Sequence, residues 1–191
     1  HILDHGCGEA LSADRVAAAC GKLWLCDAAP TVIDRLKQRC ANNPKIVPIL
    51  PDQVAAIPAG SLDLVIANSL LQYLSRAELA ALLDVWKGKL KPGGLLVVAD
   101  VIRPDTGPLT DALALLRFGW RGGFFLAAFA GLIRTALSDY RKLRATLGIS
   151  TYTQPEMEAI LHEAGFTAVR RRDENLGHNA ARMSFVAQVR P

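Results

Sequence analysis

Small polar residues follow the apolar runs in the first half of this chain, and residues of this kind can hold a polar ligand. The five positions are Asp4, Asp27, Asp52, Asn68 and Asp100. Their side-chain oxygens accept hydrogen bonds, so they can bind the donor groups of a polar ligand. A random scatter would not place five such residues at the ends of apolar runs. The pattern therefore predicts one ligand crevice to which several runs contribute.

One of these acids stands beside a glycine pair, in Ile2-Leu3-Asp4-His5-Gly6-Cys7-Gly8-Glu9-Ala10. Gly6 can adopt backbone angles that other residues avoid, and Gly8 lets the backbone approach a ligand closely. A strand that opens through Gly-x-Gly into a helix is where a nucleotide-like ligand is usually held. The same pattern also forms tight turns without a ligand, so other parts of the sequence are needed to distinguish a ligand-binding loop from such a turn.

Strands and helices alternate along most of the chain, which determines the fold class. The early strands are apolar on both faces, as in a parallel sheet covered by helices on both sides. The last two strands have a short connection, so that pair is antiparallel. We therefore expect a doubly wound, Rossmann-like α/β fold with its ligand at the carboxyl ends of the strands. Strands are expected at 1–3, 23–26, 46–50, 62–67, 95–101, 166–172 and 183–189, and helices at 12–20, 30–41, 75–90 and 153–165.

Residues 105–150 interrupt this alternation, and we expect a helical lid or substrate insertion here, within a single domain of residues 1–191. The segment could pack on the sheet, line a pocket for a hydrophobic substrate, or lie in a membrane surface with its arginines at the headgroups. These three interpretations stay open. Its large apolar residues include Phe118, Trp120, Phe124, Phe125, Phe129, Leu132 and Ile133.

Composition excludes several classes of protein. A chain of 191 residues with 51% hydrophobic and 21% charged residues is ordinary for a folded domain. The four cysteines form no Cys-x-x-Cys pair, so we expect reduced thiols, no metal site and a cytoplasmic location. The net charge of +4 comes from the second half, which would suit an anionic substrate, a membrane surface or simply a solvated face. The arginine run 170–172 lacks interleaved aromatic residues, so we expect no nucleic-acid partner.

Two kinds of nucleotide-binding protein would explain the glycine loop. In a dinucleotide-binding oxidoreductase, Gly-x-Gly-x-x-Gly is followed about 20 residues later by an acid, and Asp27 fits. However, Leu11 stands at the third glycine position, and no Tyr-x-x-x-Lys is present. An NAD(P)-dependent oxidoreductase therefore stays as an alternative.

The chain resembles the class I S-adenosylmethionine-dependent methyltransferases at segments 2–10, 25–29, 57–65 and 90–96, the last with Leu-x-Pro-Gly-Gly. The resemblance covers residues 2–102 and 151–190, and implies a seven-stranded, mostly parallel sheet with an antiparallel last strand. Ala10 stands where the family usually has a third glycine, and Gln72 where many relatives carry histidine. Because the first strand is too short and no helix precedes it, we expect the chain to be N-terminally truncated.

This resemblance implies S-adenosyl-L-methionine as the cofactor. Asp4 would order the loop and approach the amino acid end, and Asp27 would bind the ribose hydroxyls. Asp52, with the backbone of the next two residues, would face the adenine, while Asn68 and Ser69 would lie beneath the sulfonium. The implied cofactor-binding residues are Asp4, Gly6, Cys7, Gly8, Asp27, Ala28, Asp52, Gln53, Val54, Asn68 and Ser69.

The acceptor is less visible in the sequence than the cofactor. Methyl transfer is an in-line displacement at an activated sulfonium, so the protein mainly aligns the reactants and excludes water. We expect a small hydrophobic or amphipathic acceptor, and leave peripheral membrane contact and oligomeric state open. His178 is a candidate general base, and Tyr140 could bind the substrate. A non-catalytic binding protein with the same fold remains an alternative. Further polar candidates are Asn179, Tyr152, Arg144 and Arg182.

Overall fold

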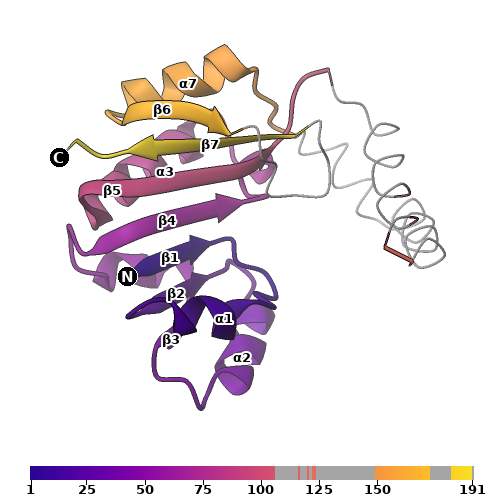
Figure 1. Cartoon of the computed structure of the whole chain (residues 1–191), viewed down its shortest axis with the longest axis vertical. Helices are drawn as coiled ribbons and strands as arrows, with labels where there is room; N and C mark the ends of the chain where they lie inside the picture. The colour runs from indigo at the N-terminus through magenta and orange to yellow at the C-terminus, as the bar shows by residue number, and fades with distance from the viewer. Residues whose placement is uncertain (106–115, 117–119, 121, 124–148, 173–181, 191) are drawn as a thin grey trace.

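A seven-stranded sheet forms the centre of the molecule (Figure 1), and the expected α/β fold class is confirmed. The computed structural model describes residues 1–105, 116, 120, 122–123, 149–172 and 182–190. The strands are β1 (Ile2–His5), β2 (Leu23–Cys26), β3 (Ile46–Ile49), β4 (Leu62–Asn68), β5 (Leu90–Val101), β6 (Thr167–Arg172) and β7 (Met183–Gln188). The helices are α1 (Ala13–Ala18), α2 (Pro30–Arg39), α3 (Arg76–Lys89) and α7 (Gln154–Glu163), with short 3-10 helices η1 (Pro51–Ala56) and η2 (Leu71–Tyr73).

The strand order is β3-β2-β1-β4-β5-β7-β6. The first five strands in this order are parallel, and β7 is antiparallel to both of its neighbours, β5 and β6. A dinucleotide-binding fold has the order 3-2-1-4-5-6, without an antiparallel strand inserted before the edge. The sheet therefore favours the methyltransferase expectation over the oxidoreductase alternative.

Helices cover both faces of the sheet because successive side chains of each strand point to opposite sides. In β2, Leu23 and Leu25 pack with α1 and α2, whereas Trp24 and Cys26 belong to the core beneath α3 and α7. Ser75 and Thr153 begin α3 and α7 with complete capping boxes, at the residues where the sequence predicts these helices to begin.

The strand β5 begins earlier than expected. Leu90 already pairs with Leu62, and the next paired residues are Leu64 and Leu95, so residues 91–94 form an irregularity within the strand. Gly93 has φ +76°, which permits this irregularity. The Pro-Gly-Gly segment thus ends α3 without ending the pairing of β5 with β4.

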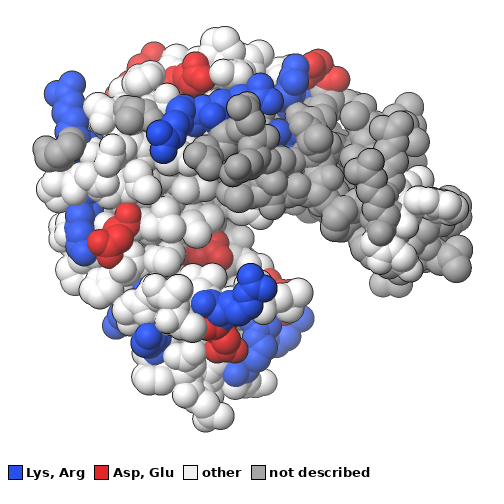
Figure 2. Space-filling model, in the orientation of Figure 1, with Lys and Arg blue, Asp and Glu red and all other residues white. Residues whose placement is uncertain are grey.

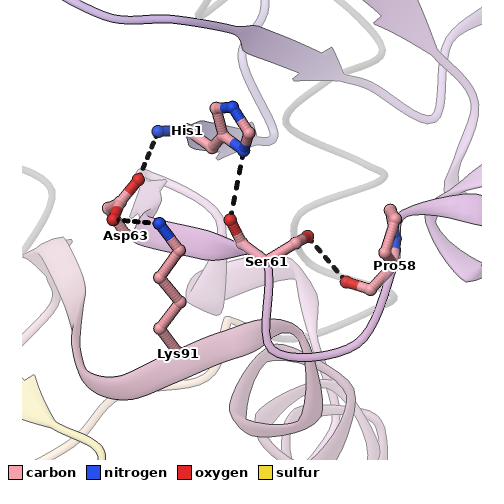
Figure 3. Close-up of polar contacts among 5 residues, drawn as sticks. All are labelled: His1, Pro58, Ser61, Asp63 and Lys91. Atoms are coloured by element: carbon pink, nitrogen blue, oxygen red, sulfur yellow. Dashed lines mark hydrogen bonds and ion pairs between the residues drawn. The ribbon is translucent and has the colours of Figure 1, made fainter.

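Asp63 is the second residue of β4, so it lies at the amino end of this strand, opposite the predicted ligand edge, and Figure 3 shows its polar contacts. Its carboxylate accepts a hydrogen bond from Lys91 Nζ at 2.6 Å and another from the backbone nitrogen of His1. The His1 ring nitrogen Nδ1 lies 3.2 Å from the Ser61 carbonyl oxygen, and the Ser61 hydroxyl donates to Pro58 O. This network joins the starts of β1, β4 and β5, so Asp63 has a structural role.

The edge strand β6 carries exposed basic side chains, including Arg170 and Arg171. Figure 2 shows a band of Lys and Arg in the region that β6 and β7 occupy in Figure 1. Charge on an edge strand discourages pairing with another sheet, which agrees with the solvated face that the sequence offers as one explanation of the basic second half.

The expected helical insertion at 105–150 falls largely outside the described residues. Of its aromatic residues, Trp120 is described, and 75% of its surface is exposed. Within the described ranges, no helix has the length and apolar character needed to cross a membrane.

Candidate functional site

The loop after β1 is held against the end of β2 by backbone hydrogen bonds. The amides of Gly6 and Cys7 both donate to Cys26 O, at 2.8 and 3.0 Å. Gly6 and Gly8 have φ of +80° and +53°, which side chains other than hydrogen disfavour. A Cβ at Gly8 would meet no atom within 4 Å, so the backbone here borders open space.

Asp27 joins the two loops with its carboxylate. Its Oδ2 accepts from the Gly8 amide at 3.0 Å, and its Oδ1 accepts from the Ala29 amide at 2.9 Å. Each carboxylate oxygen can accept a second hydrogen bond. The two amides therefore orient this carboxylate and leave it able to receive two hydroxyl groups.

Asp4 is the acid that precedes the glycine loop, and its side chain is half-buried. It makes no side-chain hydrogen bond to a described residue. Burial, and secondly the nearby charge of Asp27, raise the pKa of Asp4 to about 6. A buried carboxylate beside a second carboxylate favours a positively charged ligand group, which would stabilise its ionised form.

The end of β4 meets the glycine loop directly. Asn68 ends this strand and is exposed, and Ser69 follows with a positive φ of +55°. A Cβ added to Gly6 would lie 3.1 Å from Leu70 Cδ1, so Leu70 packs closely on the loop after β1. The structure thus brings the predicted residues of β1, β2 and β4 together at one edge.

The predicted cofactor-binding residues Asp52, Gln53 and Val54 lie in η1 after β3, and they differ in exposure and in their contacts. Asp52 is exposed, while Gln53 Oε1 accepts from the Leu50 amide at 2.9 Å and begins η1. Val54 is only 2% exposed, so its side chain belongs to the core. Asp52 offers its carboxylate to a ligand, whereas Val54 could offer only its backbone, as expected.

His5 was not assigned any role from the sequence. It is 6% exposed, and Trp86 Nε1 donates to His5 Nδ1 at 3.0 Å. Burial lowers the pKa of His5 to about 4, so the ring is neutral at pH 7 with its proton on Nε2. It lines a cavity of about 580 Å³ with Asp52 and Val54, beside α3. A histidine inside a glycine motif was the only available signal, and it did not reveal the partner on α3.

The two thiols near the loop, Cys7 and Cys26, have raised pKa values, which favours their protonated form at neutral pH. Burial first, and then the surrounding acids, raise the pKa of Cys7 far above its usual range and that of Cys26 to about 12. Among the described residues, no group of three or more His, Cys, Asp or Glu side chains could hold a metal ion.

Most acceptor-side candidates lie outside the described residues, namely His178, Tyr140, Asn179 and Arg144. Tyr152 is described, and it is fully buried with the Arg76 guanidinium 4.0 Å from its ring centre. Tyr152 is therefore a core residue, while roles for His178 and Tyr140 stay predictions.

Comparison with known proteins adds independent evidence. Residues 2–94 match the family model described as a methyltransferase domain. A carboxy-S-adenosyl-L-methionine synthase of Hydrogenovibrio crunogenus is 26% identical over 125 residues, or 63% of this chain and 50% of that protein. An uncharacterized methyltransferase of Mycobacterium tuberculosis is 30% identical over 104 residues, or 54% of this chain and 52% of that protein. The chain thus spans about half the length of the curated relatives it matches.

A solved structure shows the same fold. Human N-acetylserotonin methyltransferase in complex with S-adenosylmethionine superposes with a TM-score of 0.62 at 18% identity, covering 100% of this chain and 47% of that one. The antiparallel strand β7 lies between β5 and β6, as the resemblance to methyltransferases implies. The match of residues 2–94 to a methyltransferase domain points to the same class of protein. Residues 2–94 are therefore similar to a methyltransferase domain, and the described chain has the fold of the S-adenosylmethionine-dependent methyltransferases.

Proposed function

We propose that this chain binds S-adenosylmethionine at the loops after β1, β2 and β4, and transfers its methyl group to a small hydrophobic or amphipathic acceptor. The observation that carries the proposal is the pair of carboxylates on either side of the glycine loop. Asp27 is oriented by the Gly8 and Ala29 amides, and Asp4 is half-buried beside it. The first suits two ribose hydroxyls, and the second suits the positive amino acid end of the ligand.

The bound cofactor supplies a methyl group on a sulfonium that is already activated for displacement. The residues of this chain then have to fix its position and exclude water, since alignment dominates such a reaction. Asp27 and the Gly8 backbone hold the ribose side, and Asn68 and Ser69 lie at the neighbouring strand end. His178 and Tyr140 keep their proposed roles as general base and substrate-binding residue.

A hydrophobic acceptor is supported by the aromatic composition of residues 105–150, which follow β5 at the ligand edge. We include a cytoplasmic location and a small-molecule rather than nucleic-acid partner in the proposal. Peripheral contact with a membrane through this segment is compatible with the same chemistry.

Calorimetric titration of the chain with S-adenosylmethionine, S-adenosylhomocysteine and NAD tests the proposal. We expect the first two to bind and NAD not to bind. Asp27→Ala should weaken S-adenosylhomocysteine binding by about 1.5–3 kcal/mol, as expected for a hydrogen bond to a charged group. The control is Asp34→Ala, which removes an exposed acid of α2.

Two results would contradict the proposal. Binding of NAD without binding of the methyl donor would favour the oxidoreductase alternative. Unchanged affinity in Asp27→Ala would remove the ribose assignment, even if the donor binds.

A further inference from the structure

Two neighbouring strands end in residues with the same unusual backbone. Ser69, directly after β4, has φ +55°, and Asp100, near the end of β5, has φ +58°. Both are left-handed conformations in residues that carry a Cβ, and such conformations gather at functional sites. The two strands are parallel, so both residues lie at the carboxyl edge, where the ligand is expected.

A hydrogen bond joins these two residues. Ser69 Oγ donates to Asp100 Oδ2 at 2.7 Å in a partly buried position. The Ser69 amide also donates to Ala99 O at 3.1 Å, which extends the pairing of β4 with β5 by one residue. The start of the loop after β4 is therefore fixed to β5 by its backbone and by its side chain.

The other side of the same carboxylate faces β7. In the pairing of β5 with β7, Val98 lies opposite Phe185 and Val101 lies opposite Met183. The chain thus advances by three residues in β5 but by two in β7, which marks a bulge beside Asp100. Arg182 immediately precedes β7, and its Nε lies 3.9 Å from Asp100 Oδ1. Only 10% of the Arg182 side chain is exposed, so little solvent screens this pair.

The contact continues toward the glycine loop. Leu70 follows Ser69 and would lie 3.1 Å from a Cβ at Gly6. A shift of Ser69 would move Leu70 either into this loop or away from it. A continuous row of contacts thus runs from Arg182 through Asp100 and Ser69 to the loop after β1.

We propose that Asp100 is a positioning residue of the methyl-donor site. Its carboxylate, oriented by Arg182, holds the Ser69 hydroxyl, and so holds the loop beneath the methionine and sulfonium end of the cofactor. The inference rests on the proposed function. It gives a specific role to Asp100, which the sequence placed at the ligand crevice without a contact of its own, and to Arg182, which the sequence offered only as an acceptor-side candidate. The adenosine half of the ligand lies at Asp27 and Asp52, away from this contact row.

That separation gives a test with two ligands. Asp100→Ala and Ser69→Ala should each weaken S-adenosylhomocysteine binding about tenfold, because each removes the same charge-assisted hydrogen bond. Binding of adenosine, which lacks the methionine part, should change less than about threefold, since its contacts are elsewhere. Asp100→Asn keeps an acceptor oxygen and tolerates a left-handed backbone, so it should restore most of the affinity.

Titration calorimetry on the full chain decides the matter, with Asp105→Ala as the control for losing an exposed carboxylate at the same end of β5. The double variant Ser69→Ala/Asp100→Ala should bind S-adenosylhomocysteine no worse than either single variant, because the two act through one contact. Equal losses for both ligands would show a merely structural role and overturn the proposal. Full S-adenosylhomocysteine affinity in Ser69→Ala, which leaves the β5 backbone unchanged, would overturn it as well. Failure of the unaltered chain to bind S-adenosylhomocysteine would instead refute the proposed function.

Discussion

Backbone conformation at single residues distinguishes the ligand edge of this molecule. Among the described residues, the three non-glycine residues with positive φ are Ala10, Ser69 and Asp100. All three follow or end strands that meet at the carboxyl edge. A side chain in this conformation costs roughly 1–2 kcal/mol relative to its preferred angles. The strain is therefore concentrated where the cofactor is expected, as it is in many active sites.

Ala10, with φ +41°, occupies the position where the family usually has glycine, and this allows a direct test of the strain. Ala10→Gly should raise the free energy of unfolding by about 0.5–1 kcal/mol, because relief of strain exceeds the greater flexibility of glycine in the unfolded chain. Urea unfolding measures the difference.

The matched control for this change is Ala81→Gly. Ala81 lies in the interior of α3 and is exposed, so glycine there should lower the free energy of unfolding by about 0.5–1 kcal/mol. If both glycine variants lose stability equally, the strain at Ala10 is not significant.

At the scale of elements, the sequence was informative wherever a signal is local. The predicted features include the helix starts at Ser75 and Thr153, the glycine loop after β1 and the apolar strands β2 and β4, and all of them depend on neighbours in sequence. The pairing of Leu90 with Leu62 was not predicted, because it depends on a strand far away in the chain.

Dependence on distant parts of the chain also limits how much of the candidate site can be predicted from the sequence. Asp4 and Asp27 stand at the ends of apolar runs, so their convergence followed from the parallel sheet. The buried bond between His5 and Trp86 joins β1 to α3, and the bond between Ser69 and Asp100 joins the loop after β4 to the end of β5. Residue type alone gives no indication of such contacts, since both need the three-dimensional arrangement of elements.

The irregular start of β5 provides a prediction about an element. A Cβ at Gly94 would lie 2.9 Å from Lys91 O and 3.2 Å from Leu62 O, and both are backbone atoms. Gly94→Ala should therefore lower the free energy of unfolding by about 1–3 kcal/mol, the cost of forcing extra atoms into a packed site. Chemical denaturation measures this loss.

Gly88→Ala is the appropriate comparison for this variant. Gly88 lies in α3, and a Cβ there would meet nothing within 4 Å. Alanine should stabilise the chain by about 0.4–1 kcal/mol at this position. If the two alanine variants are equally stable, the backbone at the start of β5 accommodates a Cβ at Gly94 without loss of stability.

At the scale of the whole molecule, two adjacent residues of β1 give opposite dependences of stability on pH. The pKa of Asp4 is raised from 3.8 to about 6, so the folded chain holds a proton that the unfolded chain has lost, and stability falls as pH rises through that range. The pKa of His5 is lowered from 6.5 to about 4, so the unfolded chain binds a proton first, and stability rises as pH rises from 4 to 6.5. The two effects nearly cancel between pH 4 and 6.

Asp4→Asn should separate these effects, because it removes the titrating carboxyl and leaves His5 in place. At pH 7.5 the variant should be more stable than the unaltered chain by an amount on the order of 2–3 kcal/mol, since the buried charge is gone. Its stability should then decrease as pH falls from 6.5 to 4, while that of the unaltered chain changes little. Urea unfolding at several pH values measures both profiles, with Asp34→Asn expected to follow the unaltered chain.

The same Asp4→Asn variant should bind S-adenosylmethionine more weakly, because the carboxylate that destabilises the empty site is the group that attracts the ligand's positive end. If the stability of Asp4→Asn depends on pH as that of the unaltered chain does, and the variant binds S-adenosylmethionine with full affinity, then the Asp4 carboxylate neither destabilises the fold nor contacts the cofactor.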